Sequence, residues 1–383
     1  MKSDWTMIKL SDIAEFNPHE SLAKGTMAKK IAMDKLQPFT RDVPSFEWEP
    51  FSGGTKFRNG DTIMARITPC LENGKTAKIS CLEEGEIGFG STEYIVFRAK
   101  EGVDEDFLYY LVCSPTVREP AIKSMVGSSG RQRVQTDVVQ NLEVEVPPVE
   151  EQRSIGKLLK DLDDRIKLNT EINENLQAQA QAIYQHVIID NADDSWTPGV
   201  LSDIAIITMG QSPKGESYNE DGIGTVFFQG RAEFGFRFPA RRLYTTDPKR
   251  MARANDALMS VRAPVGDMNV AYEDCCIGRG LGAIRSKDGH QSFVLYTMLA
   301  LREQLNVFNG EGTVFGSINR DALNSMPIDI PPQEIIDQFE DIVAPMDAVI
   351  RNNYDETCRL QALRDSLLPR LMSGKLDVSE LDL

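Results

Sequence analysis

Trp5-Thr6, followed by Leu10-Ser-Asp-Ile-Ala14, is the stretch that decides the architecture of this sequence, because it occurs a second time. The second copy is Trp196-Thr197, followed by Leu201-Ser-Asp-Ile-Ala205. Self-similarity at a fixed spacing is the signature of a repeated architecture. The spacing of about 190 residues is long enough for a complete domain, so we predict a tandem duplication of domains.

Two further pairs of segments recur in the same order. Asp61-Thr-Ile-Met-Ala-Arg66 resembles Asp256-Ala-Leu-Met-Ser-Val-Arg262 with one insertion, and Leu142-Glu-Val-Glu-Val-Pro-Pro148 resembles Met326-Pro-Ile-Asp-Ile-Pro-Pro332. Each half is therefore a globular domain that ends at a Pro-Pro step and precedes a polar helical segment. The predicted segments are a first domain over residues 1–148, a first helix over 149–190, a second domain over 195–332, and a second helix with a C-terminal tail over 333–383.

The globular halves show signals for both strands and helices. The alternating runs 93–98 and 142–146 are typical of strands. The segments 105–112 and 292–299 are typical of short helices, and glycine, asparagine and proline between the runs indicate turns. We therefore predict an α+β fold, in which two mixed α/β domains with curved, twisted sheets are each followed by a long helix.

The segments after the two Pro-Pro steps show heptad-like spacing. Positions suited to a helix interface recur every three or four residues, which predicts two long helices with an a/d seam. In both helices polar residues interrupt the seam midway, and Pro345 and Pro369 are expected to kink the second helix. The seam positions are Ile155, Leu159, Leu162, Ile166, Asn169, Asn173, Leu176, Ala180, Ile183 and Val187, and then Phe339, Val343, Met346, Ile350, Asn353, Thr357, Leu360, Arg364, Leu367 and Leu371.

Two matching seams in one chain predict that the helices pair as an antiparallel coiled-coil spacer. Pairing centred on the polar break places Asn169 near Thr357 and Asn173 near Asn353. A buried polar layer of this kind sets the register of a coiled coil at a cost in stability. The alternative is two separate helices that pack on their own domains and leave these residues facing solvent.

The composition is that of a globular, water-soluble protein, with 41% hydrophobic and 26% charged residues. No run approaches a membrane span and the first residues lack a signal-peptide pattern, so we expect a cytoplasmic protein. The net charge of −16 argues at first against a nucleic-acid partner. However, residues 149–194 hold 10 acidic and 5 basic side chains and residues 333–383 hold 11 and 5, so both globular domains are nearly balanced. Each domain can therefore present a local basic face.

The sequence lacks the motifs of catalysis. It has no phosphate-binding glycine loop, no Gly-x-Ser-x-Gly elbow and no Asn/Asp-Pro-Pro-aromatic motif of an amino-methyltransferase. The three histidines are far apart and the six cysteines include no Cys-x-x-Cys pair, so we expect no metal site. The adjacent Cys275 and Cys276 are interpreted as buried thiols. We expect a non-catalytic chain.

Both domains contain loops that mix glycine, small hydroxyl residues, arginine and lysine. Arginine and lysine neutralise phosphates, whereas arginine and glutamine also have the geometry to contact base edges. For any single arginine, a structural salt bridge is an equally good interpretation. The predicted DNA-facing residues are Arg66, Lys75, Arg131 and Arg133 in the first domain and Lys214, Arg231, Arg262 and Arg279 in the second, with Gln132, Gln211 and Gln229 as base-contacting candidates.

Several segments resemble motifs of type I restriction-modification specificity (S) subunits. In the second half, Ser260-Val-Arg-Ala-Pro-Val-Gly266 and Cys276-Ile-Gly-Arg-Gly-Leu-Gly282 resemble parts of their target-recognition domains. The first half has Arg66-Ile-Thr-Pro69 where the second has Arg262-Ala-Pro, and it lacks the Gly-Arg-Gly match. The other matching segments are 196–204, Gly210-Gln-Ser-Pro213, 147–153, Asp163-Asp-Arg-Ile-Lys-Leu-Asn169 and Leu371-Met-Ser-Gly-Lys-Leu-Asp377.

The resemblance implies a DNA-recognition subunit with two target-recognition domains held apart by an antiparallel helical spacer. Each domain would recognise one half of a bipartite, asymmetric double-stranded DNA site. The partners implied are two methyltransferase (M) subunits, which carry S-adenosylmethionine, and restriction (R) subunits in the full complex. The chain itself would bind no cofactor. The alternatives are a duplicated protein-interaction scaffold that does not bind DNA and, less consistent with the motifs, a self-contained methyltransferase.

Overall fold

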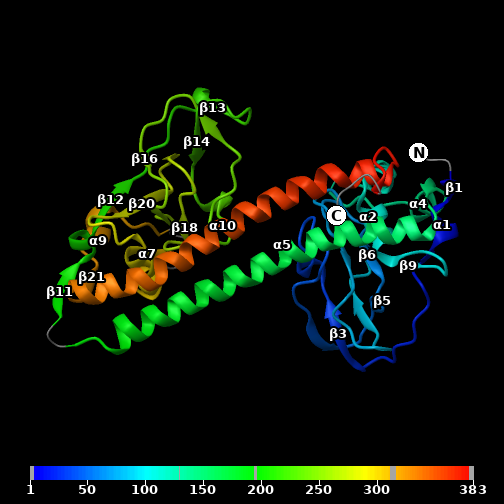
Figure 1. Cartoon of the computed structure of the whole chain (residues 1–383), viewed down its shortest axis with the longest axis horizontal. Helices are drawn as coiled ribbons and strands as arrows, with labels where there is room; N and C mark the ends of the chain where they lie inside the picture. Colours follow the sequence, from blue (N-terminus) through cyan, green and yellow to red (C-terminus); the bar gives the residue numbers. More distant parts are fainter. Residues whose placement is uncertain (1–3, 129, 194–195, 311–315, 379–383) are drawn as a thin grey trace. The chain divides into compact units, whose positions relative to one another are not determined.

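The computed structural model describes residues 4–128, 130–193, 196–310 and 316–378 (Figure 1). Three of the predicted segments begin or end outside these ranges. The residues concerned are 1–3 of the first domain, 195 of the second domain and 379–383 of the C-terminal tail. The chain divides into two compact units. Unit 1 comprises Met1–Thr170 and Tyr354–Leu383, and unit 2 comprises Glu171–Asn353. Each unit therefore contains one globular domain and a part of both long helices.

Unit 1 contains two four-stranded sheets. The first sheet is antiparallel throughout, whereas the second contains one parallel pair, β3 with β8. The first has the order β2 (Ala14–Phe16), β9 (Tyr94–Ala99), β6 (Thr62–Ala65), β7 (Thr76–Lys78), and the second has the order β4 (Glu47–Pro50), β3 (Met27–Ile31), β8 (Gly88–Gly90), β5 (Thr55–Phe57).

The first sheet is the middle layer of the domain, and the alternation of its residues explains why. Successive strand residues point to opposite faces. Val96 lies in one core cluster, which includes residues of the second sheet such as Phe57. Its neighbours Ile95 and Phe97 lie in the other cluster, which includes the domain helices and both long helices. A β-strand with apolar residues on both faces is consequently buried on both sides.

Short helices and a two-stranded ribbon complete the first domain. The ribbon pairs β1 (Thr6–Lys9) with β10 (Glu143–Val146) in antiparallel register, which brings the start of the domain beside its Pro-Pro step. The helices are α1 (Leu10–Ile13), α2 (Glu105–Cys113), α3 (Pro115–Lys123) and α4 (Thr136–Gln140), with the 3₁₀ turn η1 (Met33–Lys35). The predicted strands and the helix over 105–112 are confirmed.

Unit 2 repeats this topology, with β13 as an additional strand. Its sheets have the orders β12 (Ala205–Met209), β20 (Leu281–Ser286), β17 (Ala257–Ser260), β18 (Met268–Val270), and β13 (Tyr218–Asn219), β15 (Tyr244–Thr245), β14 (Thr225–Phe228), β19 (Cys275–Ile277), β16 (Met251–Ala252). The ribbon joins β11 (Thr197–Val200) to β21 (Pro327–Ile330). The helical elements are α6 (Leu201–Ile204), η3 (Gly215–Ser217), η4 (Arg231–Glu233), α7 (Gln291–Ala300), α8 (Arg302–Asn306), η5 (Val307–Asn309) and α9 (Arg320–Asn324).

The two long helices are α5 (Val149–Tyr184), which ends in the π-helical turn η2 (Gln185–Asp190), and α10 (Gln333–Met372). Helix α10 is continuous through Pro345 and Pro369, and the kink expected at these prolines stays a prediction. None of the predicted seam positions is exposed, and the second seam is buried at both of its ends, at Phe339 and Val343 and at Leu367 and Leu371. Within the described residues, no helix has both the length and the apolar character of a membrane span.

Candidate nucleic-acid interface

The two domains are aligned most directly by the backbone hydrogen bonds at the ends of β6 and β17. In the first domain, Arg66 N donates to Glu93 O at 2.9 Å and Thr68 N to Gln132 O at 3.0 Å. In the second domain, Val261 N donates to Gly280 O and Ala263 N to Gly316 O, both at 3.0 Å. Arg66 therefore corresponds to Val261, and Ile67 corresponds to Arg262. The insertion that the sequence comparison placed between these segments is wrong.

This one-residue difference determines where the two arginines point. Arg66 Nη2 donates to Val134 O at 3.1 Å, and its buried Nε has no partner within the described residues. The side chain is half-buried against its own domain. Arg262 is one position further along the equivalent segment and is exposed. Adjacent residues of an extended segment point to opposite sides, so the two arginines cannot have equivalent roles.

The other predicted residues of the first domain are not gathered into one site. Arg133 is joined to Glu93 by three hydrogen bonds of 2.6–2.9 Å, and this guanidinium holds the pKa of Glu93 below its ordinary value. Lys75 Nζ is half-buried and donates to a backbone carbonyl at 2.9 Å. Arg131 is exposed, and Gln132 is half-buried beside the end of β6.

The second domain gathers four of its predicted residues around one hollow of about 360 Å³. The hollow lies where β14, β17 and β19 end, and its lining includes Gln229, Arg231, Arg262 and Arg279. It also includes Arg242, which the sequence analysis missed because no motif surrounds it. The exposed Gln211 and Lys214 do not belong to this lining, although Gln211 N donates to Ile277 O at 2.9 Å on the adjoining strand.

The backbone around Arg279 is held rigidly. Three consecutive amides donate hydrogen bonds: Gly278 N to Phe228 O at 2.8 Å, Arg279 N to Ser212 Oγ at 3.2 Å, and Gly280 N to Gln229 O at 3.1 Å. A Cβ atom at Gly278 or Gly280 would approach the backbone of Gln229 to 2.8 Å. The Gly-Arg-Gly sequence is therefore required by close packing of two strands, which leaves only the arginine side chain projecting.

Acidic residues hold some of these arginines but not others. Asp267 accepts Arg231 Nη1 at 2.6 Å and Arg302 Nη2 at 3.1 Å. Glu233, which is mostly buried, accepts Arg242 Nη2 at 2.6 Å. In the part of the chain that the structure describes, the guanidinium groups of Arg262 and Arg279 have neither an ion pair nor a hydrogen bond. The hollow thus contains two unpaired cations beside two that are already neutralised.

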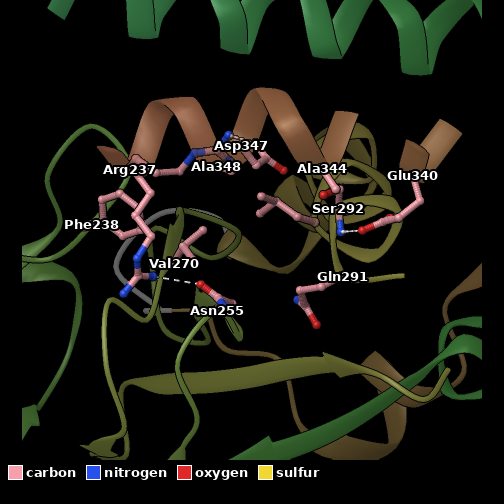
Figure 2. A pocket seen from close by; sticks show the side chains of 12 residues that line it. Arg237, Phe238, Asn255, Val270, Gln291, Ser292, Glu340, Ala344, Asp347 and Ala348 are labelled. Atoms are coloured by element: carbon pink, nitrogen blue, oxygen red, sulfur yellow. Dashed lines mark hydrogen bonds and ion pairs between the residues drawn. The ribbon is translucent and has the colours of Figure 1, made fainter. Parts of the chain in front are cut away.

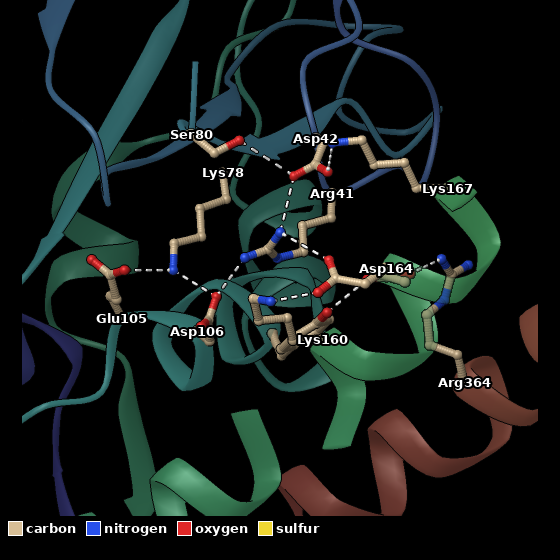
Figure 3. Close-up of polar contacts among 12 residues, drawn as sticks. Arg41, Asp42, Lys78, Ser80, Glu105, Asp106, Lys160, Asp164, Lys167 and Arg364 are labelled. Carbon is tan, nitrogen blue, oxygen red and sulfur yellow. Dashed lines mark hydrogen bonds and ion pairs between the residues drawn. The ribbon is translucent and has the colours of Figure 1, made fainter. Parts of the chain in front are cut away.

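Each domain is fastened to the long helices of its own unit by a tyrosine and an aspartate. In unit 1, Asp163 on α5 accepts Tyr110 Oη and Arg364 Nη1, both at 2.7 Å. Arg41 and Lys78 meet Asp106 nearby (Figure 3). In unit 2, Asp347 on α10 accepts Tyr296 Oη at 3.0 Å and pairs with the buried Arg237.

A second contact in unit 2 fastens the start of α7 to α10. Glu340 accepts the backbone amides of Ser292 at 3.1 Å and Phe293 at 2.9 Å, beside a pocket of about 260 Å³ (Figure 2). His290, at the N-cap of α7, lies 3.0 Å from Asp288 and 2.9 Å from Asp337. Glu340 and His290 therefore join the start of α7 to α10 within unit 2.

Both predicted polar pairs of the spacer are in contact. In unit 1, Asn169 Nδ2 donates to Glu356 Oε2 at 2.9 Å and lies 3.5 Å from Thr357 Oγ1. In unit 2, Asn353 Nδ2 donates to Asn173 Oδ1 at 2.9 Å, and Asn173 Nδ2 donates to Ile350 O at 3.2 Å. These pairs run antiparallel, as predicted. Their role in setting register stays a prediction.

The candidates for metal or thiol chemistry are few. Across the described ranges, no group of three or more His, Cys, Asp and Glu side chains is arranged to hold a metal ion. Cys275 and Cys276 are free and buried, as expected, and burial raises the pKa of Cys275 to about 12. A thiol with so high a pKa is a poor nucleophile at neutral pH.

Comparisons with known proteins agree with this architecture. A family model described as the type I restriction modification DNA specificity domain matches residues 2–178 and 194–361. The putative type I restriction enzyme MjaX specificity subunit of Methanocaldococcus jannaschii is 29% identical over 412 residues, covering 98% of this chain and 94% of the relative. The MjaIX specificity subunit of the same organism is 24% identical, covering 74% and 71%.

A solved structure supports the fold. The type I restriction-modification system S subunit from M. genitalium aligns with a TM-score of 0.60 at 14% identity and covers 96% of both chains. At this identity the likeness concerns the fold, a mixed α/β architecture with two domains and long helices. Because the two matches to the family model span most of the sequence, this chain belongs to the family of type I restriction-modification specificity subunits.

Proposed function

We propose that this chain is the sequence-specific DNA-recognition subunit of a type I restriction-modification complex. Each of its two domains recognises one half of a bipartite, asymmetric site. The observation that supports this most is that Arg262 and Arg279, on rigid backbone at the hollow of the second domain, have no ion pair among the residues that the structure describes. Exposed guanidinium groups held in place are suited to phosphates and base edges. The asymmetry follows because the equivalent positions of the first domain hold other residues.

The chain is proposed to be non-catalytic and to bind no cofactor itself. Two methyltransferase subunits would supply S-adenosylmethionine and the methyl transfer, and restriction subunits would complete the complex. The acidic helical segments 149–194 and 333–383 repel phosphates and are better suited to contacts with protein partners. The complex is proposed to act in the cytoplasm, where it would meet the host DNA.

The direct test is methylation-detecting sequencing of host DNA with and without this gene, with the M gene intact in both strains. We expect a split motif with a gap of constant length to lose its methylation when the gene is deleted. Reintroducing the gene should restore methylation at the same motif. Unchanged methylation across the genome would contradict the proposal.

The helices are proposed to set the gap between the two half-sites. Lengthening or shortening α5 and α10 by equal numbers of residues should change the gap and leave both half-sites unchanged, because no domain residue is altered. Replacing exposed residues of the two helices at unchanged length is the control. A gap that does not respond to helix length would eliminate this part of the proposal.

A further inference from the structure

The hollow of the second domain combines two features that a base-recognition site needs. Specific recognition requires a donor group that is free and a backbone that fixes its direction. Arg279 meets both conditions, because its guanidinium is unpaired within the described residues and three consecutive amides around it are hydrogen-bonded. Arg262 lines the same hollow and is equally unpaired. By contrast, Arg231 and Arg242 are neutralised by Asp267 and Glu233.

We propose that the second domain recognises a guanine through Arg279, with Arg262 as the adjacent contact in the same hollow. A guanidinium presents two parallel N–H donors, and the major-groove edge of guanine presents two acceptors, O6 and N7, at the matching spacing. Adenine presents one acceptor and one donor on that edge, so it cannot accept both bonds. This inference rests on the proposed function, and it names the base class that the second domain selects.

Glu233, which lines the hollow, and Asp267, which pairs with one of its arginines, leave Arg262 and Arg279 as the arginines of the lining without an acidic partner among the described residues. A phosphate-binding surface gains from every available cation. Here Asp267 bridges Arg231 and Arg302, and Glu233 accepts Arg242, so much of the positive charge near the hollow is cancelled. The surface therefore attracts the DNA backbone less than its arginine content suggests. Asp267 is assigned as a positioning residue that holds the Arg231 side chain at the rim.

The first domain offers an internal contrast. Because Glu93 corresponds to Gly280 in the backbone hydrogen bonds, Thr92 occupies the position of Arg279, and Ile67 occupies that of Arg262. Neither side chain can donate two parallel hydrogen bonds. The first domain therefore lacks this guanine contact, and the second half-site alone should depend on it.

The test uses the complete methyltransferase complex and synthetic DNA duplexes. Each duplex contains the motif that the complex methylates in host DNA. Each guanine of the motif is replaced singly by 7-deazaguanine, which keeps the base pair but removes the N7 acceptor. We expect one guanine, in one half-site only, at which the wild-type complex loses about tenfold or more in affinity. Arg279→Ala should weaken binding to the unmodified duplex by a similar factor and should no longer distinguish 7-deazaguanine at that position.

Arg279→Lys separates base recognition from charge, because lysine keeps the charge and lacks the planar fork. It should lose the distinction at the same guanine while keeping binding to unrelated duplexes. Arg320→Ala, which removes an exposed arginine that does not line the hollow, is the matched control and should behave as wild type. Asp267→Asn should raise binding to unrelated duplexes and lower the preference for the motif.

Two results would overturn the inference and leave the proposed function intact. One is that no 7-deazaguanine substitution affects the wild-type complex while it still prefers its motif. The other is that Arg279→Ala and Arg262→Ala weaken binding equally on every duplex and reduce its salt dependence, which identifies phosphate contacts. A wild-type complex that shows no preference for the motif would instead refute the proposed function.

Discussion

The two domains share a scaffold but differ at the strand ends. In both, an aspartate just before the central strand pairs with an arginine by two parallel hydrogen bonds, Asp61 with Arg98 at 2.8 Å and Asp256 with Arg285 at 2.7 Å. A few residues further along, Ile67 and Arg262 occupy equivalent positions. The duplication has thus kept the residues that hold the sheet together, whereas the positions just beyond the strand differ in chemistry.

The attachment of each domain to the helices shows the same division. Asp163 lies on the helix that follows the first domain, Asp347 lies on the helix that follows the second, and each accepts a tyrosine hydroxyl. The arginine partner differs, because Arg364 comes from α10 whereas Arg237 comes from the domain itself. The aspartate and the tyrosine therefore occur in both units, whereas the arginine comes from a different part of the chain in each unit.

The largest effect is expected from removing a buried carboxylate. Asp163→Ala should destabilise unit 1 by about 3–5 kcal/mol, because it removes the buried carboxylate that accepts Tyr110 Oη and Arg364 Nη1 and leaves Arg364 paired with the exposed Asp365 instead. Hydrogen exchange measured segment by segment should show faster exchange in unit 1 than in unit 2. The control is Arg165→Ala, whose exposed ion pair with Glu356 should be worth under about 1 kcal/mol. Equal loosening of both units would contradict this assignment.

The arginines that the sequence comparison matched should behave in opposite ways. Arg66→Ala should cost about 1–3 kcal/mol in the free energy of unfolding, since it removes a charged hydrogen bond to Val134 O. Arg262→Ala should change stability by no more than about 0.5 kcal/mol, because the side chain is exposed and unpaired within the described residues. Urea denaturation measures both values. A stability loss for Arg262→Ala as large as that for Arg66→Ala would show that their roles are equivalent after all.

A smaller effect is expected within the polar layer of the spacer. Asn173→Ala should destabilise unit 2 by about 1–2 kcal/mol, because it leaves the Ile350 carbonyl without its side-chain donor and removes the acceptor of Asn353. Thermal unfolding measures the loss. Asn352→Ala, at an exposed neighbouring position, is the matched control and should have little effect. No difference between the two variants would mean that the layer contributes nothing to stability.

The smallest effect concerns pH and the starts of two equivalent helices. Asp104 caps α2 by accepting the amides of Asp106 and Phe107 at 3.1 and 2.9 Å. His290 occupies the corresponding place before α7. Partial burial disfavours its charged form, but hydrogen bonds to Asp288 and Asp337 and the charges of Asp288 and Glu340 outweigh this and raise the pKa of His290 above its ordinary value.

A raised folded-state pKa adds stability that is complete below the unfolded value near 6.5 and is lost as pH rises through the folded value. Unit 2 should therefore lose a small part of its stability as the pH rises above about 6.5. The midpoint of thermal unfolding, measured across this range, should fall more for wild type than for His290→Asn. Identical pH profiles for the two proteins would exclude a contribution from His290.

Most of the fold could be predicted from local patterns in the sequence. Period-two alternation identified β9 and β10, and three- and four-residue spacing identified both long helices and the asparagine pairs between them. The alignment of Arg66 with Arg262 failed because matching letters favoured an insertion, whereas backbone hydrogen bonds set the true register. Helix α10 continues through both of its prolines, Pro345 and Pro369, without a break.

Only part of the candidate site could be predicted from the sequence. Arg262 and Arg279 were found through small-residue motifs, because glycine and proline beside an arginine indicate a constrained backbone. Glu233 and Arg242 were missed because no motif surrounds them, and Asp267 was missed because it meets Arg231 from 36 positions away, through the folding of the sheet. A local sequence pattern contains no information about ion pairs between such separate segments.

By itself, the sequence determined the duplication, the mixed α/β class, the antiparallel spacer and the family resemblance. These depend on periodicity and on local motifs, which the order of residues contains directly. Only the tertiary structure decided which arginines are free and which are neutralised. The reason is that the charge state of a surface depends on which side chains approach within a few ångströms, and Asp267 reaches Arg231 and Arg302 across more than thirty positions of chain on either side.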